Sequence, residues 1–132
     1  MNSNTKSLII ALKYLIPAIL WSIFIGFLCF TPAQELPKWE VLSFDKIGHF
    51  GIFAILVFFC IWGLAKGSES RMSLKTAILI AVLYSLIYSL LIEIIQASFI
   101  PGRSGEVVDF LADAIGCFIG LLVYQLWRKY FS

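Results

Sequence analysis

Charged residues are scarce in this sequence of 132 residues: they make up 14% of it, whereas hydrophobic residues make up 61%. A soluble domain carries about a quarter charged residues, so this composition argues against a soluble globular protein. The net charge of +2 is small, and no basic patch with interleaved aromatic residues is present. Both features argue against a nucleic-acid partner.

Cysteine and histidine are also few. The three cysteines, Cys29, Cys60 and Cys117, lie within or at the ends of apolar runs. Their odd number argues against a closed disulfide framework, and their spacing is not that of metal ligands. We therefore expect the three cysteines to behave as small buried hydrophobic side chains. The single histidine, His49, argues against the class of membrane phosphatases that uses two histidines.

What the sequence does contain is four long apolar runs, at roughly residues 8–30, 47–65, 74–99 and 107–127. Each is near or above the ~20 residues that an α-helix needs to cross ~30 Å of hydrocarbon. Because backbone polar groups in lipid must be satisfied internally, each run should be helical. The sequence therefore predicts an all-α fold, an integral membrane four-helix bundle, with residues 1–132 as one domain and the lipid bilayer as its surroundings.

The distribution of lysine and arginine predicts how this bundle is oriented. If the N-terminus is inside, the inner segments hold Lys6, Lys13, Lys66, Arg71, Lys75, Arg128 and Lys129, and the outer segments hold Lys38, Lys46 and Arg103. Cytoplasmic segments carry an excess of these two residues. Seven against three therefore predicts that both termini are cytoplasmic.

Three groups of polar residues fall on the outer side in this topology. They are Asp45 and His49 at the start of the second run, Glu93 and Gln96 near the end of the third, and Arg103, Ser104, Asp109 and Asp113 around the start of the fourth. Spacings of three or four residues place both members of each helical pair on one face. Ionisable residues at this depth are costly and mark functional sites by default. We expect these eight side chains to meet in one shallow polar pocket.

The turn "PGRSG", residues 101–105, favours anion binding at one wall of this pocket. Gly102 and Gly105 allow exposed backbone N–H groups at the N-terminus of the fourth helix, and Arg103 can bind a phosphate or carboxylate with two hydrogen bonds. The sequence requires no cofactor. A divalent metal is compatible with it, and Asp45, His49, Glu93 and Asp109 are the candidate ligands.

A stripe of small residues, Ala112, Gly116 and Gly120, follows the acidic residues along the fourth run. This spacing lets helix backbones approach closely. The face predicts close packing against a neighbouring helix, either of the same chain or of a second copy in a homo-oligomer.

Two segments carry a family resemblance: "DKIGHFGIFAILVF" (45–58) and "EIIQASFIPGRSGEVVDFLADAIGCFIG" (93–120). The chain resembles the VanZ-like family of small bacterial membrane proteins, named for an association with teicoplanin resistance, over roughly residues 14–126. The positions that match the pattern of the family are Asp45, Lys46, His49, Glu93, Gln96, Pro101, Arg103, Asp109 and Gly116. Asp113 departs from it, because such proteins often carry an asparagine there. The resemblance implies a multi-pass protein of the bacterial cytoplasmic membrane and does not specify a reaction.

Three functions are compatible with these residues. The first is binding of an anionic cell-envelope component, such as a lipid phosphate or cell-wall precursor, or of a glycopeptide antibiotic. Because the site has an excess of acidic residues, binding an anion there requires that some of them are protonated, paired or bound to a metal. The second is a membrane-embedded enzyme in which Asp45, His49, Glu93 and Asp109 perform acid–base or metal chemistry on a lipid-linked substrate, with Ser104 a conceivable nucleophile. The third is a structural or assembly subunit whose charges form a salt-bridge network within the membrane.

Overall fold

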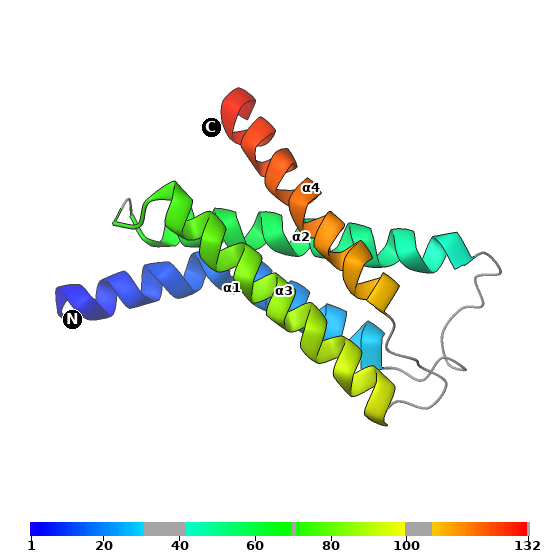
Figure 1. The fold of residues 1–132 in the computed structure, drawn as a ribbon. Coiled ribbons are helices and arrows are strands. Elements are labelled where there is room, and N and C mark those ends of the chain that lie inside the picture. Colours follow the sequence, from blue (N-terminus) through cyan, green and yellow to red (C-terminus); the bar gives the residue numbers. More distant parts are fainter. Residues whose placement is uncertain (31–41, 70, 100–106, 132) are drawn as a thin grey trace.

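The computed structural model describes residues 1–30, 42–69, 71–99 and 107–131, with side chains from residue 47 onward in the second range. It consists of four helices, α1 (Ser3–Phe30), α2 (Leu42–Gly67), α3 (Leu74–Phe99) and α4 (Val107–Phe131) (Figure 1). Within these ranges there is no strand. The predicted all-α four-helix fold is confirmed.

The helices extend beyond three of the four apolar runs. Only α3 has the predicted bounds; α1 begins five residues earlier than predicted, α2 is longer at both ends, and α4 continues to Phe131. Hydropathy marks the part of a helix that lies in hydrocarbon, whereas the helix itself continues into polar flanking residues. At the start of α1, for example, Asn2 Oδ1 accepts a hydrogen bond of 2.8 Å from the Thr5 N–H, which is an N-cap.

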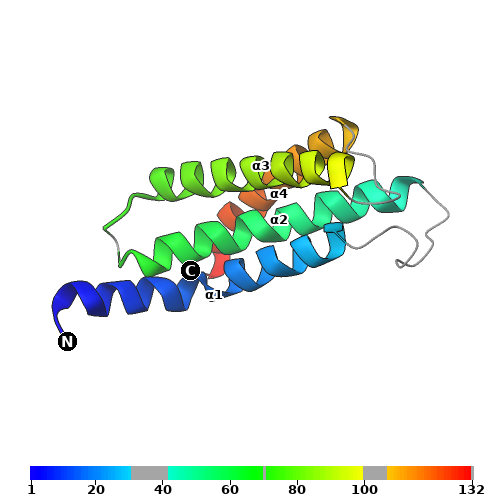
Figure 2. The same ribbon diagram turned by 90° about the horizontal axis from the view of Figure 1, so that it is seen from below.

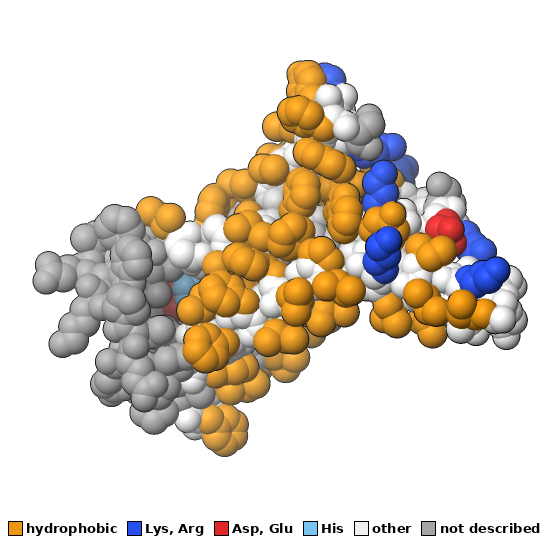
Figure 3. All heavy atoms as spheres, turned by 180° about the vertical axis from the view of Figure 1, so that it is seen from behind, with side chains coloured by type: hydrophobic (Ala, Val, Ile, Leu, Met, Phe, Trp, Pro, Cys, Tyr) orange, Lys and Arg blue, Asp and Glu red, His pale blue; other side chains and the backbone are white. Residues whose placement is uncertain are grey.

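All four helices are long and apolar enough to cross a membrane. A helix of 26 residues, such as α3, is about 39 Å long, which exceeds the ~30 Å of hydrocarbon. Large apolar side chains are exposed on the outside of the bundle, among them Phe27, Ile87, Leu111 and Phe118, and Figure 3 shows them covering much of one face. An apolar exterior of this extent suits lipid and not water, so the chain is a multi-pass membrane protein.

Helix α2 is the centre of the bundle, because it makes the most extensive contacts with α4 and α1 and also packs against α3. Four of its side chains, Phe53, Leu56, Val57 and Ile61, have no exposed surface. Helices α3 and α4 both lie obliquely to α2 (Figure 1), and Figure 2 shows α2 between α1 and α3. Cys29, Cys60 and Cys117 are buried thiols, as predicted.

The small-residue stripe of α4 packs against α2 of the same chain. A Cβ atom added at Gly116 would lie 2.3 Å from the Phe50 carbonyl oxygen, and one at Gly120 would lie 2.3 Å from the Ala54 carbonyl oxygen. Such distances are below any real Cβ contact, so only glycine permits this crossing. The stripe therefore has a role that needs no second copy of the chain.

The two ends of the bundle differ in charge. The described lysine and arginine side chains are all exposed and lie toward the end where α1 and α3 begin: Lys6, Lys13, Lys66, Arg71, Lys75, Arg128 and Lys129. Figure 3 shows basic side chains gathered there. We call this the basic end. The other end, where α1 and α3 finish and α2 and α4 begin, contains the buried acidic residues and is called the site end.

Candidate functional site

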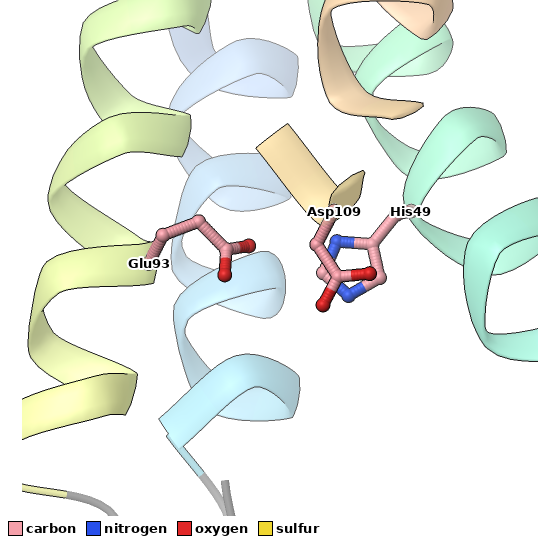
Figure 4. Close-up of side chains that lie close together, drawn as sticks. All are labelled: His49, Glu93 and Asp109. Atoms are coloured by element: carbon pink, nitrogen blue, oxygen red, sulfur yellow. The ribbon is translucent and has the colours of Figure 1, made fainter. Parts of the chain in front are cut away.

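Three of the predicted polar residues converge at the site end. His49 of α2, Glu93 of α3 and Asp109 of α4 each offer a ligand atom, and these atoms all lie within 4.8 Å of one another. All three side chains are buried, each with 6% of its surface exposed. Figure 4 shows the Glu93 carboxylate pointing from α3 toward Asp109 and His49. Three separate helices therefore bring one imidazole and two carboxylates together.

Helix geometry explains this meeting. His49 lies seven residues inside α2 and Glu93 six residues before the end of α3, which is about 10 Å and about 9 Å at 1.5 Å per residue. Asp113 lies six residues inside α4, at a similar depth, and Asp109 is one turn nearer the helix start. Residues at comparable depths on packed helices can face one another, so the cluster lies close to the site end and not at the middle of the bundle.

Asp113 extends the cluster behind the histidine. His49 Nδ1 lies 3.0 Å from Asp113 Oδ1. The Ser89 hydroxyl of α3 donates a hydrogen bond of 2.5 Å to Asp113 Oδ2. Asp113 is completely buried, and its two oxygens thus contact two different helices. We call His49, Glu93, Asp109, Asp113 and Ser89 the polar cluster.

Ser89 was not among the predicted site residues. It lies four residues before Glu93, on the same face of α3, and Ser85, Ser89, Glu93 and Gln96 form one polar stripe in the sequence. This polar stripe is the sequence feature from which Ser89 could have been predicted as a site residue. All four of these side chains are buried in the structure.

Gln96 belongs to the site end but makes a different contact. Its Nε2 donates a hydrogen bond of 2.8 Å to the Cys29 carbonyl oxygen, near the end of α1. With 2% of its surface exposed, Gln96 thus ties the last turns of α1 and α3 together. This contact gives Gln96 a positioning role at the edge of the cluster.

Three predicted site residues lie outside the described part of the structure. Arg103 and Ser104 belong to the segment 100–106, and Asp45 lies in the first turns of α2, where only the backbone is described. Their roles in the site stay predictions. The same holds for the turn formed by residues 101–105.

Two surface hollows among the described residues lie away from the polar cluster. One, of about 570 Å³, is at the basic end and is lined by Leu74, Gln125, Arg128 and Lys129. Another, of about 370 Å³, is an apolar groove between α2 and α4, lined by Ala54, Ile55, Phe58, Phe59, Gly120 and Val123. The feature that marks the polar cluster as a candidate site is its buried ionisable groups in an apolar bundle.

The arrangement can perform two kinds of chemistry. An imidazole with two carboxylates can coordinate a divalent metal ion, and His49, Glu93 and Asp109 are the residues that could hold one. A histidine whose ring is oriented by a carboxylate can also accept and donate protons, which is the arrangement of His49 and Asp113.

Comparison with known protein families identifies the class. The profile of the VanZ/LLP1 family matches residues 6–128, which is nearly the whole chain. The chain belongs to the VanZ/LLP1 family. The match is longer than the predicted resemblance over residues 14–126 and covers most or all of each of the four helices. A search of the curated proteins and a search of the solved structures each gave no significant match.

Proposed function

We propose that this VanZ-type membrane protein binds the anionic head group of a cell-envelope component at the outer face of the bacterial cytoplasmic membrane, at its polar cluster. The observation that carries the proposal is the convergence of His49, Glu93 and Asp109 within 4.8 Å in an otherwise apolar bundle. Ionisable groups in a membrane bundle are costly and serve a function by default. The outward placement rests on the lysine and arginine side chains of the basic end, which favour a cytoplasmic position.

The head group would enter at the start of α4. A helix N-terminus favours negative charge, and Arg103 in the preceding segment adds a guanidinium that suits phosphate or carboxylate. Acidic residues oppose an anion, but one acidic residue of the polar cluster, Asp113, already contacts His49 and accepts a hydrogen bond from Ser89. The apolar exterior of the bundle is compatible with a ligand that carries a lipid tail.

The proposal is tested by thermal unfolding of the purified protein in detergent, with farnesyl monophosphate as the probe and farnesol as its uncharged control. A ligand at a hundredfold excess over its Kd stabilises the folded state by about 2.7 kcal/mol. We expect a saturable stabilisation by the phosphate and none by the alcohol. Arg103→Ala and His49→Ala should reduce it, whereas Arg128→Ala, at the basic end, should not.

Two results would contradict anion binding. Equal stabilisation by farnesol would show that only the apolar tail is recognised. Absence of any shift, together with variants that behave as wild type, would leave a structural network of charges as the role of the cluster. Teicoplanin in the same assay tests the glycopeptide alternative, and a shift with teicoplanin alone would replace the lipid phosphate by the antibiotic as the ligand.

A membrane-embedded hydrolase is the second candidate, because His49 and Asp113 lie 3.0 Å apart beside two further carboxylates. Such an enzyme would use one water molecule to convert a prenyl phosphate into prenol and inorganic phosphate. Release of inorganic phosphate from the probe tests it directly. Turnover that is lost in His49→Ala and Glu93→Gln but retained in Glu69→Gln would favour catalysis over binding.

A further inference from the structure

We propose that His49, Glu93 and Asp109 form a binding site for one divalent transition-metal ion, with Asp113 and Ser89 holding the histidine in place. The ligand atoms come from three helices and lie within 4.8 Å of one another. The site itself stands on this geometry alone. Only one part of this proposal rests on the proposed function: that a phosphate oxygen would fill the open coordination position of the ion.

The distances suit a metal after a small adjustment. Tetrahedral ligands about 2.1 Å from a metal ion lie about 3.4 Å from one another. The widest pair in the cluster must therefore close by at most about 1.4 Å, which is within reach of side-chain rotation in glutamate and aspartate. No movement of a helix is required.

The contact between His49 and Asp113 is the second feature that favours a metal. In metal sites the ligating histidine commonly donates its other ring N–H to a carboxylate, which fixes the tautomer and the direction of the ring. His49 Nδ1 lies 3.0 Å from Asp113 Oδ1, so in a metal-bound form Nδ1 would donate to this carboxylate and Nε2 would coordinate the ion. Ser89 in turn donates to Asp113 Oδ2, which fixes the carboxylate itself.

The surrounding helices hold the ligands rigidly. Gly116 lies three residues after Asp113, and its close contact is with Phe50, the residue that follows His49. The crossing of α2 and α4 therefore fixes the distance between the histidine and the two aspartates. A site on such rigid elements is better preorganised than one on loops.

The ligand set indicates which ion is bound. Imidazole favours zinc, iron, copper and nickel, while carboxylates suit manganese and harder ions. One imidazole with two carboxylates therefore favours Zn²⁺ or Mn²⁺ over Ca²⁺. Three protein ligands also leave a position open, which is typical of sites where the metal binds a substrate or ligand atom. In this protein a phosphate oxygen would occupy it, and the ion would remove the conflict between an anionic ligand and an acidic cluster.

The three ligands lie near the site end of the bundle and not at its middle. Asp109 lies two residues, about 3 Å, from the start of α4. Each of the three ligands retains some exposed surface, whereas Asp113 behind them has none. Asp109 is therefore the ligand nearest the site end, and all three ligands are less completely buried than Asp113.

The test measures metal directly, on protein from which any affinity tag has been removed. After treatment with a chelator and dialysis, the protein in detergent is titrated with Zn²⁺ by calorimetry and with Mn²⁺ by electron paramagnetic resonance. We expect one ion per chain for at least one of the two metals. Glu93→Gln, Asp109→Asn and His49→Ala should each weaken binding by a hundredfold or more, and Glu69→Gln, an exposed acid at the basic end, should not change it.

The variant Asp113→Asn separates a metal site from a merely structural cluster. It keeps an oxygen for His49 but loses the negative charge, so affinity should fall 10- to 100-fold while the stoichiometry stays at one. Circular dichroism of each variant identifies any that fail to fold, and the comparison then rests on Asp113→Asn and Glu69→Gln. Absence of stoichiometric binding of both metals, or binding that survives Glu93→Gln and Asp109→Asn unchanged, overturns the proposal.

Farnesyl monophosphate added with metal and with chelator distinguishes this proposal from the proposed function. Stoichiometric metal binding without any response to the phosphate supports the metal site and contradicts the proposed binding of an anionic head group. Phosphate binding of equal strength in the presence of chelator, with no stoichiometric metal, supports the proposed function and overturns the metal site.

Discussion

His49 Nδ1 lies 3.0 Å from Asp113 Oδ1, and this contact joins α2 to α4 in the interior of the bundle. The Ser89 hydroxyl of α3 donates to the other oxygen of the same carboxylate. One buried side chain therefore connects three helices. Because a polar group in such surroundings is expensive unless it is hydrogen-bonded, the loss of Asp113 should affect both partners at once.

Asp113→Asn should be much milder than Asp113→Ala. Asparagine retains an oxygen that can accept from His49, and its amide can donate to Ser89, so we expect a loss of at most about 1 kcal/mol. Alanine leaves the ring N–H and the hydroxyl buried without this acceptor, and each such group costs about 1–3 kcal/mol. Thermal unfolding in detergent measures both. Equal losses would show that the charge, and not the hydrogen bonding, stabilises the bundle.

The crossing of α2 and α4 depends on glycine. At Gly120 a Cβ atom would lie 2.3 Å from the Ala54 carbonyl oxygen, so Gly120→Ala forces the two helices apart. We expect a loss of about 1–3 kcal/mol, as for other overpacked interiors. Thermal unfolding in detergent checks this value.

Gly51→Ala is the matched control for that change. Gly51 lies in α2, and an added Cβ atom there meets nothing within 4 Å. Alanine is better than glycine in a helix by about 1 kcal/mol, so this variant should be neutral or slightly more stable. If both alanine variants had the same effect, close packing of Gly120 would not be the cause.

The fold was predictable from the sequence because long apolar runs determine which segments can cross a membrane. Helix ends were less predictable: α2 begins at Leu42, five residues before the run, because charged residues such as Asp45 and Lys46 do not interrupt a helix. At the other end of the chain, α4 continues through Arg128 and Lys129, whose charges favour the C-terminus of a helix.

The site was predictable in part. Topology and spacing were sufficient to bring His49, Glu93 and Asp109 to the same end, because all three positions follow from helix order and rise per residue. The contacts between individual side chains were not, because they depend on the rotation of each helix about its axis. That rotation places Asp113 behind His49, next to Ser89, and directs Gln96 to the Cys29 carbonyl.

Gln96→Leu should weaken the contact between α1 and α3. The amide of Gln96 donates to the Cys29 carbonyl oxygen at 2.8 Å, and leucine keeps the bulk while removing the donor. Hydrogen bonds of this kind contribute about 0.5–1.5 kcal/mol, which is the loss that we expect in thermal unfolding. Gln125→Leu, at an exposed position of α4, is the control and should have little effect. Similar losses in the two variants would argue against this contact as a stabilising one.

The basic end should face the cytoplasm, because the described lysine and arginine side chains lie there. Single cysteines at two exposed positions test this orientation: Glu69→Cys, between α2 and α3, and Phe99→Cys, at the end of α3. In intact cells a membrane-impermeant maleimide should label Phe99→Cys, and it should label Glu69→Cys only after permeabilisation.

The native cysteines make this labelling experiment direct, because Cys29, Cys60 and Cys117 are all buried and should give little background in folded protein. Wild type measures that background. If Glu69→Cys were labelled in intact cells and Phe99→Cys were not, the polar cluster would face the cytoplasm. The proposed ligand would then have to come from the inner leaflet, and an envelope component exposed at the outer face would be ruled out.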